Sequence, residues 1–89
     1  MIRLAIPTLT EERRKDLLKV VGNRLEEARV SVRNVRRDTQ NDMRGFEREK
    51  LISEDELERG QKDLQKLTDK HVEQINSIGQ KKETEIMQV

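Results

Sequence analysis

A capping box divides this sequence into two long stretches of helical pattern. Ser53 and Glu56 have the spacing at which each side chain bonds the backbone amide of the other, and Ile52 and Leu57 flank them as a hydrophobic staple. The sequence contains one proline, Pro7, so no later residue breaks a helix that runs up to the box or away from it. The sequence therefore favours two long helices joined by a short turn.

Apolar side chains recur at steps of three and four on both sides of this turn, which is typical of helices that pack together. The predicted seam of the first helix consists of Leu18, Val21, Leu25, Ala28, Val32, Val35, Thr39, Met43 and Phe46. That of the second consists of Leu57, Gly60, Leu64, Leu67, His71, Ile75, Ile78, Ile86 and Val89. We predict an all-α fold, an antiparallel two-helix hairpin with a helix over about 10–50, a turn at 51–53 and a helix over about 54–88.

The N-terminal boundary is less sharply specified. Thr10 is the predicted helix cap, and Thr8 with Glu11 forms an alternative capping box. Before them, residues 1–9 form a predicted extended segment, because Ile2, Leu4 and Ile6 alternate as in a strand and Pro7 ends the pattern. A single strand without a partner resembles the severed end of another domain.

Composition limits the size of the core and the kind of chemistry. Charged residues make up 42% and hydrophobic residues 31%, and the mean hydropathy is −0.99, which suits thin helices rather than a thick globular core. The apolar faces are nevertheless wider than one partner helix can cover. We therefore expect a three-helix bundle whose third helix comes from elsewhere, and a homodimer when this chain is alone.

Few residues could support catalysis. His71 is the single histidine, which we interpret as a packing residue, and the absence of cysteine excludes disulfides and cysteine-based zinc sites. No glycine-rich phosphate loop or nucleophile motif occurs. We predict no catalytic residue, no metal, no cofactor and no enzyme activity. Because no apolar run reaches membrane-spanning length and no secretory signal is visible, we expect a cytoplasmic protein.

The candidate binding site is an arginine-rich segment over residues 29–38. Arg29, Arg33, Arg36 and Arg37 lie beside the predicted seam, and a guanidinium group presents a fork of donors suited to phosphate oxygens. Neutral residues occupy the positions where we would expect acidic partners in the same helix, so the arginines are not all neutralised. Residues 13–37 carry a basic excess and residues 54–89 an acidic excess. A solvated basic face without a ligand is the alternative.

Several segments together resemble one known family. They are Ile2-Arg3, Ile6-Pro7, Leu-Thr-Glu-Glu-Arg-Arg-Lys at 9–15, Val-Arg-Asn-Val-Arg-Arg-Asp at 32–38, Ile-Ser-Glu-Asp-Glu at 52–56, Asp-Leu-Gln-Lys-Leu-Thr-Asp at 63–69 and Lys-Glu-Thr-Glu-Ile-Met at 82–87. In order and spacing they are similar to the bacterial ribosome recycling factors. The family's first helix and nearly all of its inserted β/α domain have no counterpart, and residues 1–6 would be the exit strand of that domain.

The resemblance implies a function that the helical pattern alone does not. Family members combine a three-helix bundle with a second domain and act with elongation factor G to split ribosomes after termination. The bundle lies on large-subunit ribosomal RNA. The resemblance assigns Arg33, Arg36 and Arg37 to the RNA-facing motif, whereas Arg29 is added because of its position on the helix. A structural coiled-coil oligomerisation module without RNA binding is the alternative function.

Overall fold

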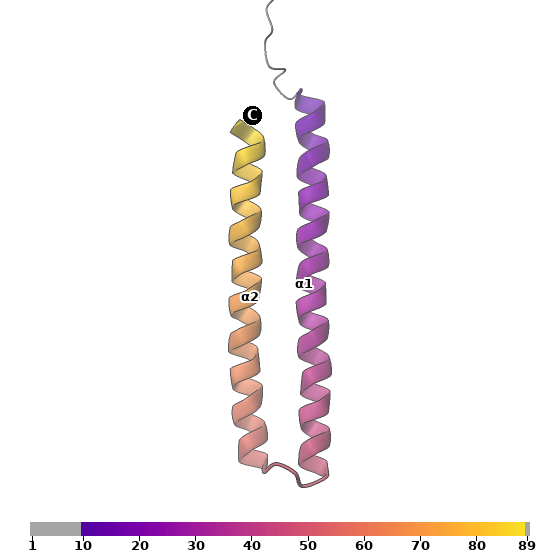
Figure 1. The fold of residues 1–89 in the computed structure, drawn as a ribbon, viewed down its shortest axis with the longest axis vertical. Coiled ribbons are helices and arrows are strands. Elements are labelled where there is room, and N and C mark those ends of the chain that lie inside the picture. Colours follow the sequence, from indigo (N-terminus) through magenta and orange to yellow (C-terminus); the bar gives the residue numbers. More distant parts are fainter. Residues whose placement is uncertain (1–9, 89) are drawn as a thin grey trace, which may run out of the picture.

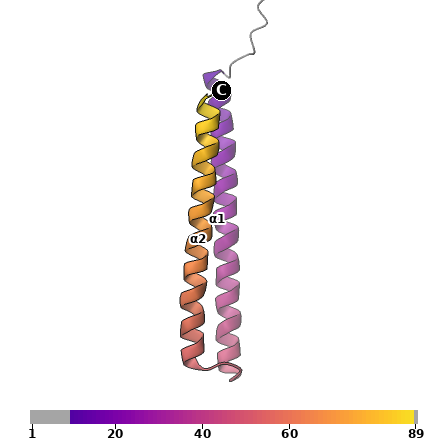
Figure 2. The same ribbon diagram turned by 60° about the vertical axis from the view of Figure 1, so that its left-hand side comes forward.

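The computed structural model describes residues 10–88, which form two helices joined by a short turn (Figure 1). Helix α1 is Glu11–Arg48, with 38 residues, and helix α2 is Glu54–Gln88, with 35 residues. They run antiparallel and lie side by side in both views (Figure 1, Figure 2). The predicted all-α hairpin is confirmed. The predicted extended segment over residues 1–9 lies outside the described residues.

Helix α1 begins at the predicted capping residue, Thr10. Thr10 has extended backbone, and its hydroxyl oxygen accepts a hydrogen bond from the amide of Arg13 at 3.1 Å. Glu11 and Glu12 follow in the first turn, where negative side chains complement the positive end of the helix dipole. The hydroxyl thus satisfies one of the amides that have no partner within the helix.

Helix α1 ends at Arg48, two residues before the predicted end. Lys50 takes a positive φ of 62°. The amides of Lys50 and Leu51 donate to the carbonyls of Glu47 and Phe46 at 2.9 and 2.8 Å. This is the Schellman pattern, which satisfies the last carbonyls of a helix and usually places glycine at the left-handed position. Because a lysine occupies that position here, no residue type marks the end of α1 in advance.

Helix α2 begins with the predicted capping box. The amide of Ser53 donates to Oε1 of Glu56 at 3.1 Å, and the amide of Glu56 donates to Oγ of Ser53 at 3.0 Å. The pKa of the Glu56 carboxyl lies below its ordinary value. The main cause is the hydrogen bond from the Ser53 amide, followed by the Ser53 hydroxyl and the positive charge of Arg59. The reciprocal bonds fix where α2 starts and therefore where the chain reverses.

The contact between the helices is narrow and made largely of half-buried apolar side chains. Those of α1 include Leu18, Val21, Leu25, Val32 and Met43, and those of α2 include Leu57, Leu64, Val72 and Ile75. Thr68 and Gly79 are the buried residues of α2. No hydrophobic side chain in the described part of the chain is fully buried. Two helices alone therefore leave this core incomplete.

Part of the predicted seam is wrong because the contact is rotated on both helices. Val35 and Leu67, assigned to the seam, are 63% and 53% exposed. The residues that follow them, Arg36 and Thr68, lie closer to the contact. Phe46, His71 and Ile78 are likewise exposed.

The helices approach closely at small residues of α2. A Cβ added to Gly79 would collide with Leu25, and one added to Gly60 would collide with Met43. The larger apolar side chains consequently flank the contact.

Candidate nucleic-acid interface

Two grooves of opposite character run along the helix contact. The apolar groove has a volume of about 260 Å³ and is lined by Ser31, Val32, Val35, Arg36, Leu64, Leu67, Thr68 and His71. The polar groove is lined by Arg33, Arg36, Thr68, Asp69, Val72, Glu73 and Asn76. Arg36 and Thr68 line both grooves and so lie between them. The hairpin therefore separates a side suited to apolar packing from a side that carries charge.

The four arginines predicted to bind RNA, here called the basic flank, do not share one environment. The side chains of Arg33 and Arg37 are 52% and 63% exposed. Those of Arg29 and Arg36 lie closer to α2: Arg29 is 24% exposed, and Nε of Arg36 is buried without a hydrogen-bond partner among the described residues. Two members of the basic flank thus reach solvent freely, and two contribute to the helix contact.

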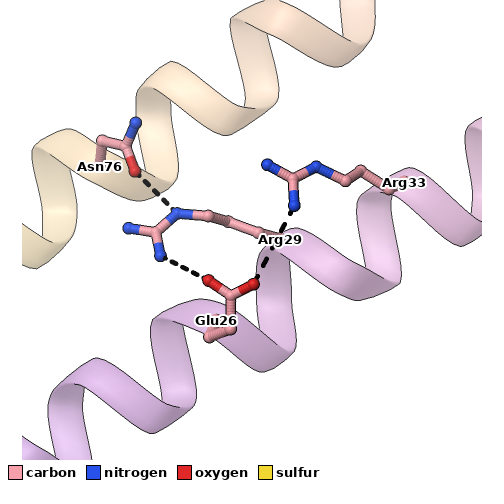
Figure 3. Close-up of polar contacts among 4 residues, drawn as sticks. All are labelled: Glu26, Arg29, Arg33 and Asn76. Atoms are coloured by element: carbon pink, nitrogen blue, oxygen red, sulfur yellow. Dashed lines mark hydrogen bonds and ion pairs between the residues drawn. The ribbon is translucent and has the colours of Figure 1, made fainter.

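Arg29 connects the two helices through a polar cluster. Its Nε donates to Oδ1 of Asn76 on α2 at 2.9 Å, and its Nη1 donates to Oε2 of Glu26 at 3.1 Å. The other carboxylate oxygen of Glu26, Oε1, lies 4.0 Å from Nη1 of Arg33. Figure 3 shows the carboxylate reaching both guanidinium groups, with Asn76 meeting Arg29 from the facing helix. One carboxylate thus lies between two arginines.

Glu26 corrects one expectation from the sequence. We expected neutral residues where acidic partners of the arginines would lie, but Glu26 pairs with Arg29 within the same helix. A spacing of three residues places side chains on one face of a helix, so this pair could have been found from the sequence. Asn76 could not have been found in that way, because 47 positions separate it from Arg29.

The remaining charges near the basic flank leave Arg33 and Arg37 largely available. Nε of Arg37 lies 3.8 Å from Oδ1 of Asp38, and both side chains are well exposed, so this ion pair is weak. Asp69 accepts a hydrogen bond from Gln65 of its own helix at 2.8 Å. Within residues 10–88, neither Asp69 nor Glu73 forms an ion pair with an arginine of the basic flank.

The other candidate groups form no second site within residues 10–88. His71 is exposed, and its Nδ1 lies 2.9 Å from the carbonyl oxygen of Leu67 in the preceding turn. The described part of the chain holds no group of three or more His, Cys, Asp or Glu side chains that could bind a metal ion. Neither α1 nor α2 combines the length and apolar character needed to cross a membrane.

A helix pair with one apolar groove and one arginine-rich side places the chain among the all-α helical hairpins, and comparison with known proteins gives its family. A model of the family described as ribosome recycling factor matches residues 1–87. The chain belongs to the ribosome recycling factor family. The family name describes a step of translation and names no enzymatic reaction, in agreement with the prediction that the chain is not an enzyme.

Similar proteins carry the same name. The ribosome-recycling factors of Syntrophomonas wolfei, Bacillus subtilis and Chloroflexus aurantiacus are 58%, 56% and 54% identical to this chain over 89 residues. In each case the match covers 100% of this chain and 48% of the relative. The chain thus spans about half the length of these relatives.

Proposed function

We propose that this chain is the ribosome-binding helical arm of a ribosome recycling factor, and that its basic flank contacts phosphates of large-subunit ribosomal RNA. The main support is the outward position of Arg33 and Arg37, which are more than half exposed on a helix of a family named for ribosome recycling. Arginine on a rigid helix pair binds phosphate without first having to order a loop.

The four arginines take different parts in this proposal. Arg33 and Arg37 are the principal phosphate contacts, because their guanidinium groups are open to solvent. Arg36 contributes positive charge at the edge of the polar groove, which it lines together with Arg33. Arg29 supports the site from the helix contact, where Asn76 and Glu26 hold it.

Substitution of the exposed arginines tests the proposal. Arg33→Ala and Arg37→Ala should each weaken binding to purified large ribosomal subunits, because each removes a phosphate contact. Each should also reduce the slope of log affinity against log salt by up to roughly one unit. Arg24→Ala is the matched control, since Arg24 is 79% exposed on the same helix but lies outside the basic flank. Unchanged affinity in both variants would contradict the proposal and favour a coiled-coil module that binds no RNA.

The apolar groove gives the arm a second kind of partner. In the intact factor, we infer, a third helix fills this groove, and the complete protein acts in the cytoplasm with elongation factor G to split ribosomes. When the 89-residue chain is alone, a second copy fills the groove instead and gives a homodimer with a four-helix core. Arg33 and Arg37 stay open in both cases, because neither lines the apolar groove, whereas Arg36 lies at its edge.

A further inference from the structure

We propose that the Glu26 carboxylate occupies a phosphate position between Arg29 and Arg33, and that an RNA phosphate displaces it on binding. Glu26 thereby masks one phosphate site in the free protein and lowers its affinity for RNA. The inference rests on the proposed function and adds a residue that regulates the same site.

The two arginines beside Glu26 differ in how firmly they are held. The 2.9 Å bond from its Nε to Asn76 restrains Arg29 between the two helices, and its side chain is only 24% exposed. Arg33 has no such partner on α2 and is 52% exposed (Figure 3). A ligand placed between them therefore meets one restrained guanidinium group and one that can adjust.

The contacts of Glu26 differ on the two sides. Its 3.1 Å contact with Arg29 is a hydrogen bond, whereas the 4.0 Å contact with Arg33 is only an ion pair. Arg33 therefore keeps its donors available. An RNA phosphate presents two non-bridging oxygens on a tetrahedral phosphorus, so one oxygen can accept from each guanidinium group. Because it is not tethered to α1, the phosphate can approach Arg33 more closely than the Glu26 carboxylate, which lies 4.0 Å away.

Displacing the carboxylate costs little. Glu26 is 59% exposed, so it can swing into water without leaving a buried charge behind. Exposed ion pairs of this kind contribute little to stability because water and salt screen them. The helix contact does not depend on Glu26, since Leu25, Val32 and the Arg29–Asn76 bond remain when it moves.

A neighbouring carboxylate provides a matched control. Glu27 is 70% exposed and lies 3.7 Å from Arg24 in a three-residue spacing, much as Glu26 pairs with Arg29. Glu26→Gln and Glu27→Gln therefore remove the same charge from adjacent exposed positions. Only the first removes it from between Arg29 and Arg33.

The experiment measures binding of a short fluorescent RNA duplex by the 89-residue chain at several salt concentrations. Glu26→Gln should bind up to about fivefold more tightly at about 0.1 M salt, the upper limit for the loss of an exposed ion pair, and its salt slope should steepen by up to roughly one phosphate contact. Glu27→Gln should gain much less. In a chain that already carries Arg33→Gln, adding Glu26→Gln should give no comparable gain, because the released site needs both arginines.

The outcomes separate this inference from the proposed function. Equal effects of Glu26→Gln and Glu27→Gln would mean that only overall charge matters, and weaker binding by Glu26→Gln would mean that the carboxylate positions Arg33 for RNA. Either result overturns the masking role. The proposed function fails by a different measurement, when Arg33→Ala and Arg37→Ala leave affinity for large ribosomal subunits unchanged.

Discussion

At the scale of single residues, the four glycines divide into two that lie against the other helix and two that do not. Near Gly22 and Gly45 a Cβ would meet no atom within 4 Å, whereas at Gly60 and Gly79 it would collide with a side chain of α1. The collision at Gly60 involves only the terminal methyl of Met43, which can shift. At Gly79 the Cβ would also lie 3.0 and 3.2 Å from two further atoms of Leu25. Gly79 is therefore the glycine that fixes helix spacing.

Alanine substitutions should reveal this division. Gly22→Ala and Gly45→Ala should each stabilise the chain by about 0.5–1 kcal/mol, because alanine loses less backbone entropy in a helix. Gly79→Ala should destabilise it, since overpacking of about 1–3 kcal/mol outweighs that gain. Chemical denaturation monitored by circular dichroism measures these changes. A stabilised Gly79→Ala variant would show that Leu25 moves aside freely.

At the scale of elements, the capping box couples the start of α2 to pH. The pKa of Glu56 is lowered in the folded chain from an ordinary value of 4.5. A lowered pKa means that the charged carboxylate stabilises the fold above pH 4.5 and that this contribution is lost as pH falls through the folded value. Glu56→Ala should therefore lower Tm at neutral pH, and the difference from the natural chain should shrink in acid.

Glutamine provides the control for this measurement. Glu56→Gln keeps an acceptor for the Ser53 amide but cannot titrate, so its Tm difference from Glu56→Ala should not shrink in acid. Thermal unfolding between pH 7 and about pH 3 compares the three chains across the range in which carboxylates titrate. If the difference between the natural chain and Glu56→Ala stays constant with pH, the cap does not act through its charge.

The elements also show which features the sequence could predict. The caps at Thr10 and Ser53 depend on neighbours three residues away, so their residue types suffice to locate them. The end of α1 lies two residues before the predicted position of about 50. Lys50 adopts the left-handed conformation that glycine usually occupies at the end of a helix, so its residue type did not indicate the boundary.

Val35 and Leu67 were predicted to lie in the helix contact but are mostly exposed. Which face of each helix meets the other depends on the close approach at Gly60 and Gly79. The spacing of apolar residues within one helix does not contain that information.

For the candidate site, the sequence could predict the exposed arginines but not the arginines that contact α2. Arg33 and Arg37 could be located as exposed cations from their spacing alone, and the structure places both in solvent. The partial withdrawal of Arg29 and Arg36 depends on how α2 lies against α1. The bond to Asn76 is therefore a product of the fold rather than of local sequence.

At the scale of the whole molecule, the incomplete core predicts association. Val35, Leu67 and Ile78 are each more than half exposed, and the first two line the apolar groove. Because these side chains are already partly covered, burying the rest contributes roughly 1 kcal/mol each, about half the value for a fully exposed side chain, and three of them together are significant for a small chain. Sedimentation equilibrium should give about twice the chain mass of 10.5 kDa at micromolar concentration.

Substitutions in the groove should reverse that association. Leu67→Lys and Val35→Lys should shift the chain towards monomer, because a lysine ammonium cannot be buried between apolar faces. Val30→Lys is the control, since Val30 is 44% exposed but lies outside the apolar groove. A monomer that melts cooperatively without any substitution would mean that the hairpin is stable with its groove open.

The tight turn has a consequence for how the molecule folds. Near the turn, contacts such as Met43 with Gly60 join residues close in sequence, whereas Leu25 with Gly79 closes a much longer loop. Because the entropy lost on closing a loop grows with its length, the hairpin should zip from the turn and its open end should separate first. Residues 29–37 lie between these two contacts, so the basic flank is assembled only when zipping is well advanced.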